Sequence, residues 1–148
     1  MEESGEFNMK ILIIDDSKTA RMFSRKCVEM ALPGEKIEFR EAENGALGYD
    51  LLKKEKVDII LSDINMPVMS GFTFLRNVKM EADLAHIPIV FITSLANDAR
   101  SVNLKELGAY AVISKPIKPK EVGNVLKEII GNKGPAAPAD QDGGAWGA

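Results

Sequence analysis

Short apolar runs alternate with amphipathic helical patterns five times along this chain, and that alternation limits the possible folds more than any other feature. The runs are rich in β-branched residues, and in the segments between them apolar residues recur every three or four positions. The expected strands are 10–14, 36–42, 57–61, 87–93 and 109–114, and the expected helices are 17–31, 44–54, 70–81, 98–107 and 119–130. Strands that alternate with helices in this way form a parallel sheet covered on both faces.

Right-handed crossovers restrict such a chain to a few arrangements. We predict an α/β fold of the flavodoxin-like type, a doubly wound five-stranded parallel sheet in the order 2-1-3-4-5 with helices on both faces. Ligands of these sheets bind beyond the carboxyl ends of the strands, where the first and third strands are neighbours. The apolar positions expected to face the core are Ala20, Phe23, Cys27 and Ala31 in the first helix and Leu47, Leu51 and Leu52 in the second.

The two ends of the chain differ in composition from its centre. Residues 1–9 contain three acids and no base, and residues 131–148 are rich in Gly, Ala and Pro. We therefore expect an acidic amino-terminal extension over 1–9, one folded domain over 10–130 and a flexible tail over 131–148. Within that tail, Trp146 is the one candidate anchor.

Charge and cysteine content exclude several classes of protein. The 148 residues carry a formal net charge of −3, which gives no electrostatic reason to expect direct binding to nucleic acid or to an anionic membrane. The single cysteine, Cys27, cannot form an internal disulfide, the first residues do not resemble a signal peptide, and no apolar run could span a bilayer. We expect a cytoplasmic protein without membrane insertion.

Polar residues follow the expected strands at their carboxyl ends. Asp15 and Asp16 end the first strand, Asp63 the third, Thr93 the fourth and Lys115 the fifth. Because parallel strands end at one edge of the sheet, these groups can converge. Clustered carboxylates favour a hard cation such as Mg²⁺, and a cation, a hydroxyl and an ammonium group together suit a phosphoryl group. A carboxylate can itself accept that group.

Each of these residues also has a purely structural interpretation. Asp16 or Ser17 could cap the first helix, Asp63 could stabilise the turn before Pro67, and Lys115 could be a solvated surface charge. These interpretations weaken together, because each would have to place its residue at the same edge independently. A zinc site is unsupported, since the one histidine of the chain precedes the fourth strand at the opposite edge.

Four segments carry a specific pattern: LIIDDS (12–17), LSDINMPVMSG (61–71), FITS (91–94) and SKP (114–116). With these segments, residues 10–130 resemble the receiver domain of bacterial response regulators, in its single-domain, chemotaxis-Y-like form. The resemblance implies that Asp63 is the phosphoacceptor. It also implies a Mg²⁺ site formed by Asp16, Asp63 and the backbone carbonyl of Asn65, with Asp15 acting through water.

The resemblance implies further roles and an activity. Thr93 would hydrogen-bond the phosphoryl group, Lys115 would pair with it, and the Lys115–Pro116 peptide bond would be cis. The phosphoryl group would come from the phosphohistidine of a histidine kinase or phosphotransfer protein, or from a small phosphodonor, and would be lost by autodephosphorylation. We thus expect a stand-alone switch that binds a target protein on the face formed by helix 98–107, strand 109–114 and helix 119–130.

The chain departs from the family pattern at two positions. Val112 stands where the family usually has an aromatic residue, and Tyr110 is two residues too early to replace it simply. We predict that phosphorylation still occurs but that its conformational readout is rewired. Leu95 and Asn65 flank the expected path of the hydrolytic water, so the apolar Leu95 is either ordinary helix-end packing or a modulator of autodephosphorylation.

Three other classes share part of this pattern. A haloacid-dehalogenase-type phosphatase uses similar groups but requires Asp-x-Asp on the first strand, whereas here Asp63-Ile64-Asn65 follows the third. A flavodoxin-like FMN module needs a phosphate loop rich in Ser, Thr and Gly, where this chain has DDSKT. A receiver-like module that has lost phosphorylation would lack catalytic positions that this chain retains.

Overall fold

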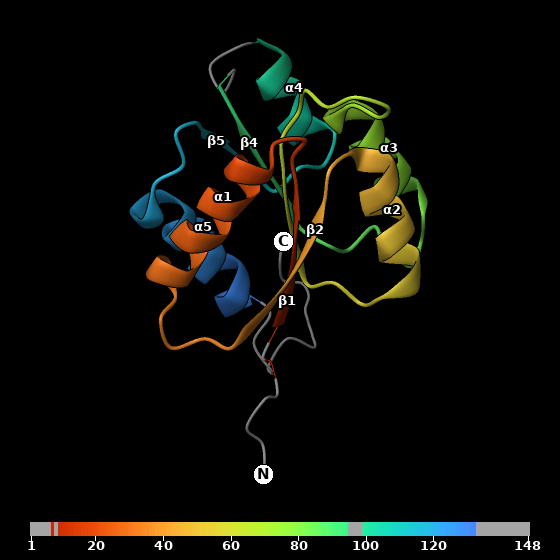
Figure 1. Cartoon of the computed structure of the whole chain (residues 1–148). Coiled ribbons are helices and arrows are strands. Elements are labelled where there is room, and N and C mark those ends of the chain that lie inside the picture. Colours follow the sequence, from red (N-terminus) through yellow and green to blue (C-terminus); the bar gives the residue numbers. More distant parts are fainter. Residues whose placement is uncertain (1–6, 8, 95–98, 133–148) are drawn as a thin grey trace.

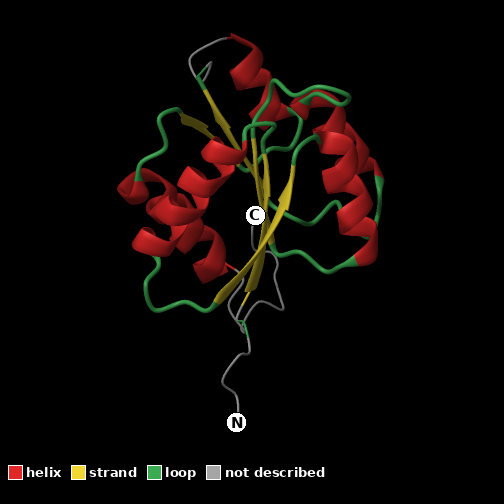
Figure 2. Ribbon diagram, in the orientation of Figure 1, coloured by secondary structure: helices red, strands yellow, loops and turns green. Residues whose placement is uncertain are grey.

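The computed structural model describes residues 7, 9–94 and 99–132, in which five strands alternate with five helices (Figures 1 and 2). The strands are β1 (Met9–Ile14), β2 (Ile37–Ala42), β3 (Ile59–Ser62), β4 (Ile89–Thr93) and β5 (Ala111–Ser114). The helices are α1 (Lys18–Ala31), α2 (Gly45–Lys54), α3 (Gly71–Met80), α4 (Ala99–Glu106) and α5 (Pro119–Asn132). No helix in these ranges is long and apolar enough to cross a membrane.

The strands form one parallel sheet in the order β2-β1-β3-β4-β5, which confirms the predicted topology. Helices α1 and α5 cover one face, and α2, α3 and α4 cover the other (Figure 1). Three strands begin two residues later than expected, at Ile59, Ile89 and Ala111. For β4 the reason is Pro88, which has no N–H to donate to the strand ladder.

The sheet separates two hydrophobic clusters, and consecutive residues of a strand belong to different ones. In β1, Ile13 packs with the α1/α5 cluster and Ile14 with the cluster under α2, α3 and α4. Every residue of β3 and β4 is buried. This burial on both faces explains why these strands are continuous apolar runs rather than alternating ones.

One expected core position in α1 is wrong. Phe23 is 52% exposed, because the face of α1 that meets the sheet is centred on Ser24, Cys27 and Val28. The apolar pattern identified a stripe along the helix but placed its centre one residue too early. Phe23 thus lies on the outer flank of α1.

A second expected core position, Leu47 in α2, is also wrong, since its side chain is 48% exposed. Helix α2 approaches the sheet through Gly48, where an added Cβ would lie 2.5 Å from Cδ1 of Ile14. Gly48 and Leu52 of α2 therefore face the sheet, and Leu47 is turned outward.

Helices α1 and α5 are in close contact through a glycine. A Cβ added at Gly123 would lie 2.9 Å from Cβ of Ala31, which is closer than real Cβ contacts. The same helix contains Gly131, around which an added Cβ would meet nothing within 4 Å. The same substitution at Gly123 and at Gly131 therefore separates the effect of packing from that of helix propensity.

We expect Gly123→Ala to lower the free energy of unfolding by about 1–2 kcal/mol, because overpacking outweighs the gain in helix propensity. Urea unfolding followed by circular dichroism measures this change. Gly131→Ala is the matched control and is expected to be neutral or to stabilise by up to about 1 kcal/mol. Equal effects of the two substitutions would contradict the close approach of α1 and α5.

Candidate functional site

Three carboxylates converge at the carboxyl edge of the central strands. Ile14 of β1 pairs with Ser62 of β3, so the residues that follow, Asp15 and Asp63, lie side by side. The N–H of Asp63 continues the ladder by donating to the carbonyl of Ile14 at 2.9 Å. Asp15, Asp16 and Asp63 each present an oxygen, and these atoms lie within 4.8 Å of one another. The predicted convergence of the acids is confirmed.

Lys115 brings positive charge to this cluster. Its Nζ lies 3.3 Å from Oδ2 of Asp15 and 3.3 Å from Oδ2 of Asp63. The backbone N–H of Lys115 donates to the carbonyl of Thr93 at 3.0 Å, which ties the start of this loop to the end of β4. The Lys115–Pro116 bond is cis, as predicted. Lys115 is thus not a solvated surface charge.

The pKa values of the two partners reflect both burial and pairing. Burial would lower the pKa of Lys115, but the charges of Asp63 and Asp15 and the hydrogen bonds to them outweigh it, and the pKa is raised. Burial and the charge of Asp15 raise the pKa of Asp63 more than Lys115 and the hydrogen bond from the N–H of Ile64 lower it. That hydrogen bond, to Oδ1 of Asp63, measures 2.7 Å. One lysine therefore compensates the acids only in part.

The start of α1 resolves which residue caps the helix. Ser17 is the N-cap, since its hydroxyl accepts from the N–H of Ala20 at 3.1 Å. The buried carboxylate of Asp15 accepts from the N–H of Ser17 at 2.9 Å. Asp16 is exposed, and its carboxylate lies within the acidic cluster instead of capping α1.

Two residues that hold this site were not predicted from the sequence. Arg21 donates from Nη1 to the carbonyl of Asp15 at 2.6 Å and from Nε to Glu41 at 2.8 Å. A base one turn after an acidic pair is the only signal for this role, because Glu41 is distant in the sequence. The second residue is Gly71, at the start of α3.

Gly71 lies against the loop that follows Asp63. Its N–H donates to the carbonyl of Ile64 at 2.7 Å, and an added Cβ would lie 2.8 Å from Cα of Ile64 and 3.1 Å from the carbonyl oxygen of Asp63. Asn65 lies in this loop and is exposed. The glycine lets α3 begin directly behind the phosphoacceptor predicted from the sequence.

The structure describes some, but not all, of the residues predicted to take part in the switch. Thr93 is buried at the end of β4, and Val112 of β5 pairs with Phe91 and packs on the cluster under α2, α3 and α4. Tyr110 precedes β5 and packs on the opposite cluster, where its hydroxyl donates to Glu128 of α5. Burial and Glu128 raise the pKa of Tyr110 to about 12. Leu95 lies outside the described residues.

The donor set fits a hard divalent cation. The cluster offers carboxylate oxygens alone, and within the described ranges no histidine or cysteine joins it. Asp16 has solvent access, which leaves room for the water ligands that Mg²⁺ usually keeps. Asp15, Asp16 and Asp63 are therefore the residues that could hold such an ion.

Comparison with known proteins identifies the family. The family model described as the response regulator receiver domain matches residues 11–127. The chain is 30% identical over 131 residues to the chemotaxis protein CheY-3 of Vibrio cholerae, covering 88% of this chain and 98% of that protein. It is also similar to the solved structure of the chemotaxis response regulator CheY4 of Vibrio cholerae, with 30% identity and a TM-score of 0.70 over 82% of this chain and 98% of that one.

A more distant neighbour supports the fold. The receiver domain of a sensor histidine kinase from Pseudomonas aeruginosa has a TM-score of 0.73 at 20% identity, covering 83% of this chain and 98% of that one. That neighbour was crystallised with a magnesium ion coordinated in its active-site cleft.

We expect Asp63→Asn to raise the free energy of unfolding without Mg²⁺ by about 0.5–2 kcal/mol, because it removes a charge whose burial is only partly compensated. Added Mg²⁺ should stabilise the wild type and leave the variant almost unchanged. Urea unfolding with and without Mg²⁺ measures both effects. Asp83→Asn, an exposed charge change between α3 and β4, is the control. A destabilised Asp63→Asn variant would contradict this account of the site.

Proposed function

The chain belongs to the response regulator receiver family, and we propose that it is a phosphorylation switch in which Asp63 accepts a phosphoryl group in a Mg²⁺-dependent reaction. The observation that carries this proposal is the position of Lys115, 3.3 Å from both Asp15 and Asp63. An ammonium group shared by Asp15 and Asp63 is placed to offset the charge of a dianionic phosphoryl group on Asp63, a role beyond that of a structural ion pair.

The proposed reaction is an in-line displacement. An oxygen of the Asp63 carboxylate attacks phosphorus, the O–P bond forms as the N–P bond of phosphohistidine breaks, and the imidazole leaves and takes up a proton. Lys115 offsets the negative charge of the phosphoryl oxygens, and the hydroxyl of Thr93 donates to one of them. Mg²⁺ held by Asp16, Asp63 and the carbonyl of Asn65, with Asp15 acting through water, would supply further positive charge at the same oxygens.

Hydrolysis then resets the switch. Water attacks the phosphorus, inorganic phosphate leaves, and the Asp63 carboxylate is regenerated. We propose that Leu95 modulates this step, since it follows Thr93 by two residues in the sequence. The activity is catalytic in the sense of self-modification, and the protein acts mainly as a signalling switch.

The readout is proposed to differ from that of relatives with an aromatic at the position of Val112. Val112 cannot swing a ring toward Thr93, and Tyr110 is tied to Glu128 of α5 on the other side of the sheet. We propose that the target protein still binds the face formed by α4, β5 and α5, but that backbone and packing shifts around Val112 replace the aromatic movement.

The phosphodonor protein is proposed to dock beside the acidic cluster on α1. Met22 and Phe23 are 58% and 52% exposed, in the second turn after Asp16 and Ser17. Exposed large apolar side chains next to a reactive site are suited to protein contact. We propose that this partner is a histidine kinase or phosphotransfer protein and, given the single buried cysteine, that the protein works in the cytoplasm.

Labelling with acetyl phosphate tests the central proposal. We expect the wild type to gain the mass of one phosphoryl group when Mg²⁺ is present, and Asp63→Asn to gain none. Lys115→Met should slow labelling by roughly a hundredfold, because one charge-stabilising donor is lost. Intact-mass spectrometry measures each rate, and Asp83→Asn should label as the wild type does. Labelling of Asp63→Asn at the normal rate would reject Asp63 as the acceptor.

If the phosphodonor protein docks on α1, a substitution there should slow transfer from that protein but not from a small phosphodonor. We expect Phe23→Ser to slow transfer from a phosphorylated histidine kinase by about tenfold, because it removes an aromatic anchor, and to leave labelling by acetyl phosphate unchanged. The kinase for this assay is chosen from a panel of histidine kinases as the one that phosphorylates the wild type fastest. Met30→Ser, at the far end of α1 and 64% exposed in the wild type, is the matched control. Equal rates for both variants would place docking elsewhere.

A further inference from the structure

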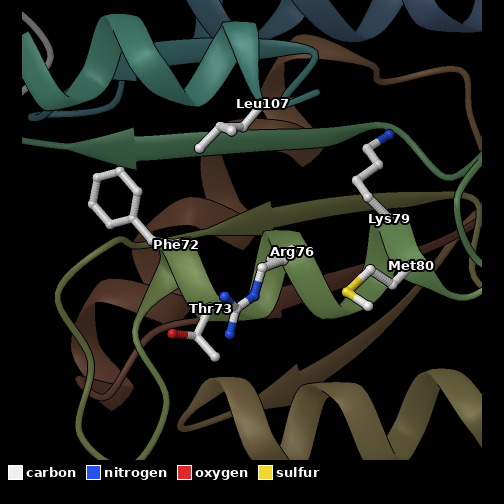
Figure 3. A pocket seen from close by; sticks show the side chains of 6 residues that line it. All are labelled: Phe72, Thr73, Arg76, Lys79, Met80 and Leu107. Atoms are coloured by element: carbon white, nitrogen blue, oxygen red, sulfur yellow. The ribbon is translucent and has the colours of Figure 1, made fainter.

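A groove lies between α3 and the end of α4, on the face of the sheet opposite α1 and α5 (Figure 3). Its volume is about 350 Å³, and its lining residues are Phe72, Thr73, Arg76, Lys79, Met80 and Leu107. None of these residues takes part in the phosphorylation site described above. We refer to this feature as the α3/α4 groove.

The α3/α4 groove exposes large apolar side chains. Met80 is 77% exposed and Leu107 is 58% exposed, while Phe72 is half-buried against the core. Figure 3 shows Phe72 and Leu107 extending toward each other from the two sides, with Met80 further along α3. Such exposed apolar surface is unfavourable in water, and a partner that covers it gains free energy.

The charge of the α3/α4 groove has one sign. Its charged lining residues are Arg76 and Lys79, and helix α3 contains no acid. The Nζ of Lys79 donates to the carbonyl of Ala85 at 2.9 Å, and an added Cβ at Gly108 would lie 2.9 Å from its Cε. Lys79 is therefore held in place between the segment that follows α3 and Gly108, which follows α4.

Arg76 differs from Lys79 because it is available to a partner. It is exposed, and no carboxylate in the described part of the chain pairs with it. An arginine beside exposed apolar side chains is a combination enriched at the energetic centres of protein interfaces. Its guanidinium can bind a carboxylate through two hydrogen bonds.

We propose that the α3/α4 groove binds an acidic amphipathic helix of a partner protein. The apolar residues of that helix, spaced by three or four positions, contact Phe72, Leu107 and Met80, and an acid next to them pairs with Arg76. A small molecule fits less well, because a pocket for one encloses most of its ligand, whereas the Met80 wall is open to solvent.

The α3/α4 groove also has a direct connection to Asp63. Gly71 contacts the loop after Asp63, and the next residue, Phe72, lines the groove. A shift of that loop would move the first turn of α3 and with it Phe72. Helix binding would therefore respond to phosphorylation; this second part rests on the proposed function, and the binding itself does not.

A displayed library of short helical peptides tests the binding. The library is selected on the whole wild-type chain, and the affinity of the enriched peptides for Arg76→Glu is measured afterwards. We expect the enriched peptides to carry acids and apolar residues at helical spacing, and to bind Arg76→Glu at least about tenfold more weakly, because like charges then face each other. Met80→Ser should weaken binding as well, and Lys127→Glu, an exposed charge reversal on α5, should not. Amide shifts in ¹⁵N spectra should change around Phe72, Arg76 and Leu107.

The proposal would be overturned by enriched peptides that are neutral or basic, by equal affinity for the wild type and Arg76→Glu, or by amide shifts that lie on α1 or α5. Self-association of the chain that Arg76→Glu abolishes would assign the α3/α4 groove to a second copy and would also overturn it. Arg76→Glu should still label with acetyl phosphate at the wild-type rate. If acetyl phosphate did not label the wild type but the peptides still bound in the groove, the proposed function would be rejected and the groove proposal would stand.

Discussion

The pairing of β1 with β3 is the constraint on which the site depends, because it forces two carboxylates into contact. Once Ile14 lies opposite Ser62, Asp15 and Asp63 must follow side by side, whatever their mutual repulsion. The hydrophobic burial of the two strands supplies the free energy that holds them there. Lys115 offsets part of the repulsion. The remaining negative charge attracts a hard cation. The repulsion between the carboxylates therefore destabilises the fold and at the same time favours cation binding at the site.

Much of the fold can be predicted from short sequence patterns, because the burial of a strand or helix determines which of its residues are apolar. Continuous apolar runs mark strands buried on both faces, and right-handed crossovers leave few ways to order them. Phe23 and Leu47 show the limit. A helical pattern identifies an apolar stripe, but the centre of the stripe depends on how closely the helix approaches the sheet. In α2 that approach is decided by Gly48, which has no side chain to contribute to the pattern.

The site residues that directly follow strand ends could be predicted from the sequence. Those whose contacts depend on tertiary packing could not. Asp15, Asp16, Asp63 and Lys115 converge because parallel strands end together. The contact of Arg21 with the carbonyl of Asp15 depends on the packing of α1 against β2, which no local pattern encodes. Tyr110 is a similar case: a strand from residue 109 would have put it on the same face as Val112, but β5 begins only at Ala111.

The division of the core by the sheet has a consequence for how such a protein can diversify. The helices α1 and α5 share one hydrophobic cluster, and α2, α3 and α4 share the other, with only the backbone and alternating side chains of the sheet between them. Substitutions on one side therefore leave the packing of the other largely intact. A lineage could alter the outer surface of α3 while retaining that of α1, or the reverse, and either change would leave the carboxylates at the edge of the sheet in place.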